Sequence, residues 1–304
     1  MCIKYIFMLI EEAEFNSRLV LSGRPFSVRD SSRTTRSEKS TIGRTDDVHS
    51  WTMDQTISIM DNNTYNHEIG IQWLQQAEAE HASVASFARH TLQLMSIGAP
   101  SELLHRSQAA SIDEIKHAKM CYGFASIFLD QDMIPGSLDV ENSLEKVEIK
   151  DIILSLIHEG CIEESLAALE AHFRAKIAKD STVKATLKEI ADDETNHATL
   201  AWETIQWILS KKPGYHTLVQ NYFQDEIEKQ MLKSNDYDPT PPMTTCNDYG
   251  KYDYLHRFGV LGSSDRETIR RFGIKKIIKP TLKFGFDHFS SIFDNIVSSD
   301  MSMI

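Results

Sequence analysis

The six residues Asp113-Glu114-Ile115-Lys116-His117-Ala118 return eighty positions later as Asp193-Glu194-Thr195-Asn196-His197-Ala198. On an α-helix, side chains three positions apart lie on one face, so each copy directs a carboxylate and an imidazole to the same side. Isolated Glu-x-x-His pairs also begin at Glu78 and Glu102. The longer repeat, with its preceding Asp and following Ala, is therefore the informative pattern, and it predicts a metal site.

A further glutamate precedes each copy at a similar distance. Glu80 lies 34 residues before Glu114, and Glu164 lies 30 residues before Glu194. The two glutamates of each pair lie on either side of an expected turn between two helices. At about 1.5 Å per residue, their distances from that turn along the helix axes differ by no more than roughly 6 Å. We therefore expect each pair to face one another across a helical hairpin.

Three neighbouring glutamates are alternatives for the upstream positions, namely Glu78, Glu159 and Glu163. Glu80 and Glu164 are preferred because the residues three or four positions away from them are apolar or small. A charged side chain within an apolar stripe needs a partner, which a metal ion would supply.

Hydrophobic periodicity predicts four long helices, at residues 67–96, 101–128, 150–179 and 183–209. The first and third connections are short, whereas residues 129–148 form a longer one that contains Pro135-Gly136. Helices joined by short, long and short connections match an all-α four-helix bundle with one long crossover between helices 2 and 3, in which metal sites lie in the core.

Composition restricts the class of protein. The chain has 304 residues, 41% of them hydrophobic, which is enough for a substantial core, and a net charge of −12 that argues against binding to a nucleic-acid backbone. The four cysteines have no CxxC spacing, so we expect a reducing, intracellular compartment, cytoplasmic by default.

Both ends of the chain differ from the expected bundle at 67–209. Residues 1–66 contain a basic Ser/Thr-rich stretch and an apolar start too short to span a membrane, so we expect a disordered tail or an organelle-targeting extension. Residues 210–304 are expected to be a partly helical appendage that covers the open end of the site as a lid. Basic and apolar residues alternate over 270–284, which fits packing on the bundle better than contact with a membrane surface.

The repeated motif resembles the ferritin-like di-iron carboxylate superfamily over residues 67–209. The resemblance implies two iron ions, or alternatively manganese, and it implies that Asp113 and Asp193 each accept a ring N–H from the histidine of the opposite helix. It also implies metal-bridging roles for Glu114 and Glu194. The six metal ligands implied are Glu80, Glu114, His117, Glu164, Glu194 and His197.

Three further residues are expected near the site. His81 is interpreted as a packing histidine, or one that supports the ligands, rather than a seventh ligand. Cys121 and Cys161 lie about one turn from predicted ligands and are interpreted as small core residues. In the ribonucleotide reductase small subunit a radical tyrosine stands where this chain has Cys121, so a tyrosyl-radical subunit is not expected.

The resemblance implies a non-haem di-iron oxidoreductase that activates dioxygen to oxidise or hydroxylate a small organic or nucleoside substrate with an external electron donor. Two other hypotheses remain open: a peroxide-removing di-manganese or di-iron enzyme, and a non-enzymatic protein that binds or oxidises iron or serves as a helical scaffold. The sequence also leaves open a homodimer.

Overall fold

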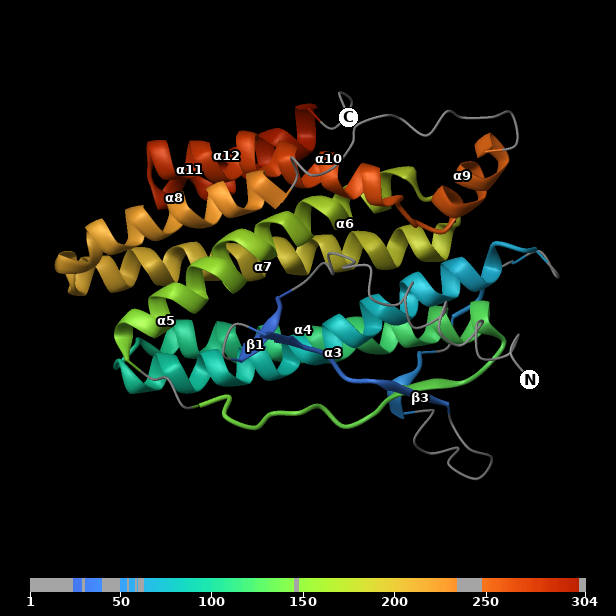
Figure 1. The fold of residues 1–304 in the computed structure, drawn as a ribbon, viewed down its shortest axis with the longest axis horizontal. Coiled ribbons are helices and arrows are strands. Elements are labelled where there is room, and N and C mark those ends of the chain that lie inside the picture. Colours follow the sequence, from blue (N-terminus) through green and yellow to red (C-terminus); the bar gives the residue numbers. More distant parts are fainter. Residues whose placement is uncertain are drawn as a thin grey trace, which may run out of the picture.

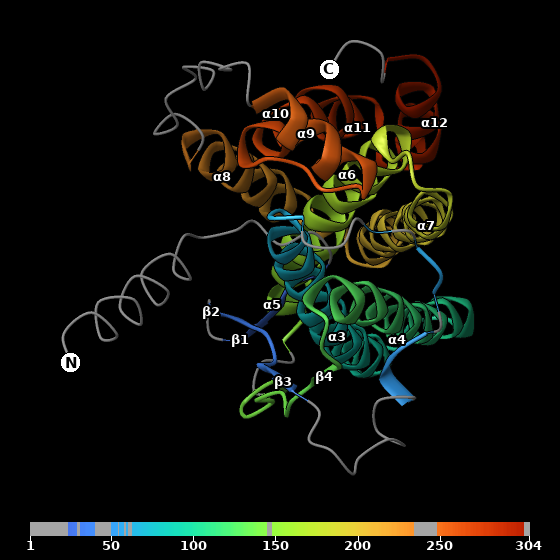
Figure 2. The ribbon, with the colours of Figure 1, turned by 90° about the vertical axis from the view of Figure 1, so that its right-hand side faces the viewer.

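The computed structural model describes residues 24–28, 31–39, 50–53, 55–57, 59, 63–144, 148–233 and 248–300. This part of the chain is mostly helical, with a few short strands, as the all-α prediction requires. Its helices form three groups that follow one another across the molecule (Figures 1 and 2). The first two groups contain the four predicted long helical segments, and the third contains the C-terminal helices.

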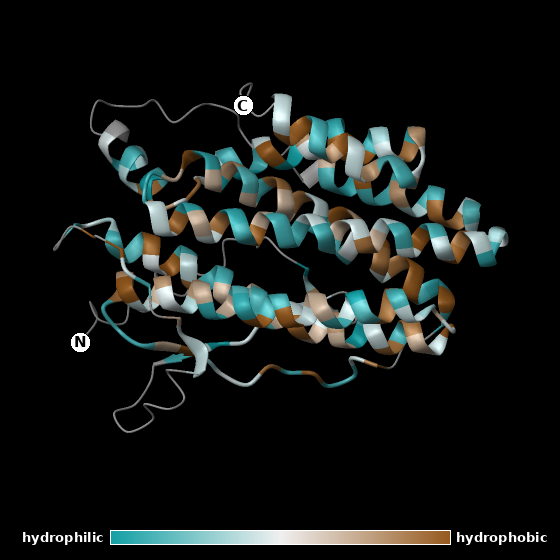
Figure 3. Cartoon of the chain, turned by 180° about the vertical axis from the view of Figure 1, so that it is seen from behind, coloured by the Kyte–Doolittle hydropathy of each residue, from teal (hydrophilic) through white to brown (hydrophobic). Residues whose placement is uncertain are grey.

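The first group is an antiparallel pair, α3 (Asn66–Ser96) and α4 (Ser101–Leu129). A short turn joins them, and Gly98 adopts a φ of +69° there, a conformation that a glycine reaches without steric cost. Brown and teal residues alternate along the long helices in Figure 3, which is the amphipathic pattern that the periodicity predicts. The ends of both helices agree with the prediction to within about one residue.

A long connection follows α4 and returns along the first pair (Figure 1). It contains β4 (Met133–Pro135), which pairs antiparallel with β3 (Ser37–Lys39) from the N-terminal region. Because the connection runs back along the first pair, the third helical segment starts at the end of the molecule where α4 begins. It then runs in the same direction as α4. The second and third long helical segments are therefore joined by a long connection.

The second group contains a continuous helical run and α7 (Ser181–Lys211). The run consists of α5 (Ile149–Ser155), the π-helix η1 (Leu156–Glu164) and α6 (Ser165–Ile177). A π-helix, with its i→i+5 hydrogen bonds, is rare and occurs often at functional sites. This one ends at the glutamate that the sequence singled out.

Close approach between η1 and α7 requires small residues. A Cβ atom added to Gly160 would lie 2.7 Å from the Cβ of Ala201, and real Cβ atoms do not come that close. The second group is therefore packed too tightly at this level to hold any larger residue at position 160.

The third group packs on the outer side of α6 and α7 (Figure 2). It comprises η2 (Pro213–Tyr215), α8 (His216–Lys233), α9 (Asp248–Arg257), α10 (Ser263–Gly273), η3 (Ile274–Ile278), α11 (Lys279–Phe284), η4 (Phe286–His288), α12 (Phe289–Asn295) and η5 (Ile296–Asp300). Ile274, Ile277 and Ile278 are at most 2% exposed and belong to the largest hydrophobic cluster. The apolar side of this basic stretch therefore packs on the protein, as expected. Within the described residues, none of the helices has the length and apolar character needed to cross a membrane.

Part of the N-terminal region differs from the expected disordered tail. β1 (Phe26–Val28) and β2 (Ser31–Arg33) form a hairpin, and Phe26 is 1% exposed in a small cluster with Ala82 of α3. The segment has few apolar residues, but it gains order by burying a ring and through hydrogen bonds between Arg24 and the α3 residues Ser83 and Ser86. Residues 1–23 and 40–49, about which disorder or targeting was also predicted, lie outside the described residues.

Candidate metal centre

The six predicted ligands come together in the interior. Their donor atoms form two groups, each with all atoms within 4.8 Å of one another, and every member is at most 2% exposed. One group combines Glu80 of α3 with His117 of α4, and the other combines Glu164 of η1 with His197 of α7, while Glu114 and Glu194 belong to both. Either group could hold a metal ion.

The distances show that Glu114 and Glu194 lie between the two histidines. Nδ1 of His117 lies 3.8 Å from Glu114 Oε2 and 3.6 Å from Glu194 Oε1. Nδ1 of His197 lies 3.2 Å from Glu114 Oε1 and 3.6 Å from Glu194 Oε2. The two carboxylates therefore occupy the shared middle of the site, and Glu80, 3.7 Å from His117 Nδ1, lies on one side of it.

The outer nitrogen of each histidine contacts an aspartate from the other motif helix. Nε2 of His117 lies 3.1 Å from Asp193 Oδ2, and Nε2 of His197 lies 3.3 Å from Asp113 Oδ2. These are the two crossed contacts that the resemblance implies. If each Nε2 carries the proton, each Nδ1 presents a lone pair to the centre, which is the form that binds a metal ion.

The centre contains an unusual concentration of unpartnered polar atoms. Nine buried donor atoms of the six side chains have no hydrogen-bond partner: one oxygen of Glu80, both oxygens of Glu114, Glu164 and Glu194, and Nδ1 of His117 and His197. Buried polar groups are ordinarily paired, because an unpaired one costs free energy. Four carboxylates and two imidazoles also suit a divalent metal such as iron or manganese. The residues therefore fit a bound cation.

Two of the carboxyls bind protons unusually tightly. Burial, reinforced by the neighbouring Glu114 carboxylate, raises the pKa of Glu80 to about 8. Burial and the nearby Glu194 raise the pKa of Glu164 well above its ordinary value. In the absence of a cation, protons therefore neutralise part of the negative charge at the centre.

The other titratable groups shift in the opposite sense despite their burial. Contacts with the two histidines lower the pKa of both Glu114 and Glu194. Burial also opposes the charged form of His117 and His197, but their aspartate and glutamate partners raise the pKa of both rings. The arrangement favours positive charge at its middle, whether from protons or from a metal ion.

The three alternative glutamates have other partners. Glu159 accepts hydrogen bonds from Arg89 at 2.6 and 2.7 Å. Glu163 accepts from Arg270 of α10 at 2.9 and 3.0 Å. Glu78 accepts from the backbone and hydroxyl of Ser37. None of the three belongs to either group of converging donor atoms.

The other residues expected near the site take packing positions. His81 lies with its ring edge-on to Trp51, at 5.1 Å between centroids, and belongs to neither donor group. Cys121 and Cys161 are free thiols with no exposure, and burial raises the pKa of both well above the ordinary value. Both are therefore buried as protonated, uncharged side chains at neutral pH.

Two polar residues near the centre, Gln76 and Arg174, were not predicted from the sequence. Gln76 donates a short hydrogen bond from Nε2 to Glu80, and Arg174 donates to Gln76 Oε1 at 3.3 Å and to the carbonyl of Gly259 at 2.8 Å. Gln76 lies four residues before Glu80, so helical spacing alone could have identified it. Arg174 and Gly259 come from distant segments and have no such local signal.

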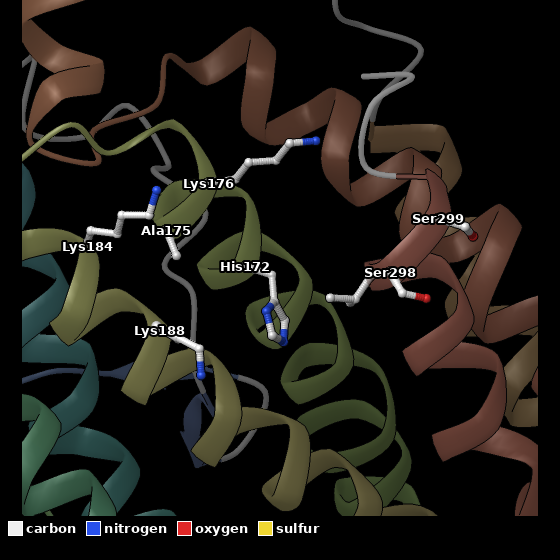
Figure 4. Close-up of a pocket in the computed structure, with 8 residues that line it drawn as sticks. His172, Ala175, Lys176, Lys184, Lys188, Ser298 and Ser299 are labelled. Atoms are coloured by element: carbon white, nitrogen blue, oxygen red, sulfur yellow. The ribbon is translucent and has the colours of Figure 1, made fainter.

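The pocket in Figure 4 lies on the surface between α6, α7 and η5 and has a volume of about 480 Å³. Its lining contains a histidine, three lysines and two serines, namely His172, Lys176, Lys184, Lys188, Ser298 and Ser299. None of the six converging ligands lines it. This pocket is therefore separate from the candidate metal centre.

Comparisons with known proteins give no relative. No protein-family model, no curated protein and no solved structure matches this chain.

Proposed function

We propose that this chain is a non-haem di-iron oxidoreductase of the ferritin-like type, whose four long helical segments form the metal-binding bundle. One iron ion would be held by Glu80 and His117 and the other by Glu164 and His197, with Glu114 and Glu194 bridging them. When bound, such a pair of ions supplies the redox chemistry and the open coordination positions at which dioxygen reacts.

The observation that carries this proposal is the convergence of nine unpartnered buried donor atoms in two groups that share two carboxylates. A purely structural cluster would be expected to pair these atoms with hydrogen-bond donors. Four carboxylates carry the charge that balances two divalent cations, and the set contains no thiolate that would favour zinc.

The chain's own residues would orient the ligands and keep water out. Asp113 and Asp193 would each accept the Nε2 proton of the opposite histidine, which would leave the Nδ1 lone pair directed inward. The ring of Phe87 packs against the imidazole of His197, with 5.0 Å between the two ring centroids. Low exposure of all six ligands favours a small substrate such as dioxygen at the centre, with electrons from an external donor.

The test is the metal content per chain after anaerobic loading with Fe(II) and removal of free metal. Wild type is compared with Glu114→Ala and Glu194→Ala, and with Glu189→Ala as the control. Glu189 lies on the same helix as Glu194 but pairs with Lys116 at the surface. We expect about two iron ions in wild type and in the control, and a loss in the two centre variants.

Dioxygen consumption by the loaded protein, with a reductant present, is measured next. Iron-dependent uptake that is absent from both centre variants supports the oxidoreductase. Failure of wild type to retain any redox metal overturns it, and turnover of peroxide without reductant or organic substrate favours a peroxide-removing enzyme instead.

A further inference from the structure

Arg24 reaches the interior from the N-terminal segment. It is 2% exposed, its Nε donates to Ser86 Oγ at 3.0 Å, and its carbonyl accepts from Ser83 Oγ at 2.7 Å. Its Nη1 has no hydrogen-bond partner. A buried guanidinium with an unpartnered nitrogen is costly, so its position calls for a physical reason.

Glu159 does not provide that reason. Nη2 of Arg89 already donates to both oxygens of this carboxylate, whereas Arg24 approaches it only to 3.9 Å through Nε. The charges of Arg89 and Glu159 cancel. The positive charge of Arg24 is therefore not needed to neutralise Glu159.

The guanidinium of Arg24 lies beside the half of the centre formed by Glu164 and His197. A Cβ placed on Gly160, one turn before Glu164, would be 3.5 Å from Arg24 Nη1. The guanidinium carbon also lies 4.6 Å from the centroid of Phe87, whose ring contacts His197. Burial lowers the pKa of Arg24, while the nearby carboxylates of Glu159 and Glu164 act to raise it.

The two halves of the centre differ at the corresponding position. Four residues before Glu80 stands Gln76, which donates a hydrogen bond to that carboxylate. Four residues before Glu164 stands Gly160, which has no side chain to do so. Arg24 brings a charged group from a distant segment to this place but, unlike Gln76, makes no hydrogen bond to the carboxylate, because both oxygens of Glu164 are without a partner.

We propose that Arg24 tunes the metal centre electrostatically: its fixed positive charge, which lies against Gly160 near the Glu164–His197 half, weakens cation binding in that half and makes the two halves unequal. This role depends on the metal centre proposed above. By Coulomb's law, a unit charge and a divalent cation separated by about 10 Å in a medium with an effective dielectric constant of about 20 repel each other enough to change the affinity on the order of 100-fold.

The experiment is an anaerobic titration of the full chain with Co(II), followed by its d–d absorption and by calorimetry, to obtain both stepwise dissociation constants. We expect Arg24→Gln to tighten the weaker step by about tenfold or more. Arg24→Lys, which keeps the charge, should keep both constants within about threefold of wild type. The control Arg33→Gln changes an arginine of the same segment that contacts Asp139 at the surface and should have no effect.

Several outcomes would overturn this role. Unchanged constants in a folded Arg24→Gln protein, verified by circular dichroism and thermal unfolding, would refute the action of its charge while leaving the metal centre intact. Equal shifts in Arg24→Lys and Arg24→Gln would show a packing effect and would refute the role of the charge. If only Arg24→Lys folds, constants that move more than about threefold from wild type would refute it as well. Absence of any Co(II) binding in wild type would instead remove the metal centre itself.

Discussion

Replacing Glu80 by glutamine should stabilise the metal-free protein. Burial raises the pKa of Glu80 to about 8, against an ordinary value of 4.5. At pH 7 the unfolded chain has lost this proton while the folded chain keeps it, and 2.5 pH units at about 1.36 kcal/mol each amount to about 3 kcal/mol. Glutamine is neutral, retains an acceptor oxygen for Gln76 and removes this cost.

The sign of the effect depends on pH and on metal. A carboxyl whose folded-state pKa is raised costs nothing below pH 4.5, where both states hold the proton, and its cost grows as the pH rises from 4.5 towards 8. Urea unfolding with a chelator should therefore show Glu80→Gln more stable than wild type at pH 7 by up to about 3 kcal/mol, and nearly equal to it at pH 4.5. With Co(II) present the order should reverse, because wild type gains binding free energy that the variant lacks.

The surface variant Glu189→Gln serves as the control and should change stability little under any of these conditions. A chelated Glu80→Gln protein that is less stable than wild type at pH 7 would refute the electrostatic argument. It would mean that the negative charge of Glu80 stabilises the fold, as a structural glutamate hydrogen-bonded to Gln76 would.

Two further predictions follow from the contacts. Asp113→Asn and Asp193→Asn should each weaken metal binding by about 10- to 100-fold, because asparagine can still accept the ring N–H but lacks the negative charge that strengthens the histidine as a ligand; a competition titration against a chromophoric chelator measures this. Ile277→Ala should lower the free energy of unfolding by about 2–5 kcal/mol, since Ile277 has no exposure, whereas the nearby Phe284→Ala, at a side chain 61% exposed, should change it by less than about 1 kcal/mol in the same urea titration. A small effect at Ile277 would show that the C-terminal helices contribute little to the core.

Local sequence was sufficient to predict the long helices and to place the glutamate and histidine of each motif on one helical face. The spacing of Glu114 and His117, and of Glu194 and His197, places each pair on one helical face whatever the rest of the chain does. Helix ends near residues 96, 101 and 211 follow from turn residues and hydrophobic periodicity, which are also local.

In the third helical segment, hydrophobic periodicity alone could not predict which glutamate faces the centre. From Leu156 to Glu164 the chain forms a π-helix, whose hydrogen-bond spacing changes the rotation per residue and so the phase of every side chain on it. Glu159, Glu163 and Glu164 could not be ranked by an α-helical wheel. Small and apolar neighbours favoured Glu164, but the partners that separate these glutamates are arginines from distant parts of the chain.

Only the tertiary structure could supply those arginines. Arg89 lies 70 residues before Glu159, and Arg270 lies 107 residues after Glu163, so no local helical spacing links them. The pairings exist because buried charges need partners, and the fold decides which charges meet. Local periodicity predicted the helix positions, and the repeated motif with its family resemblance predicted the six candidate ligands, whereas the charges that surround them depend on long-range packing.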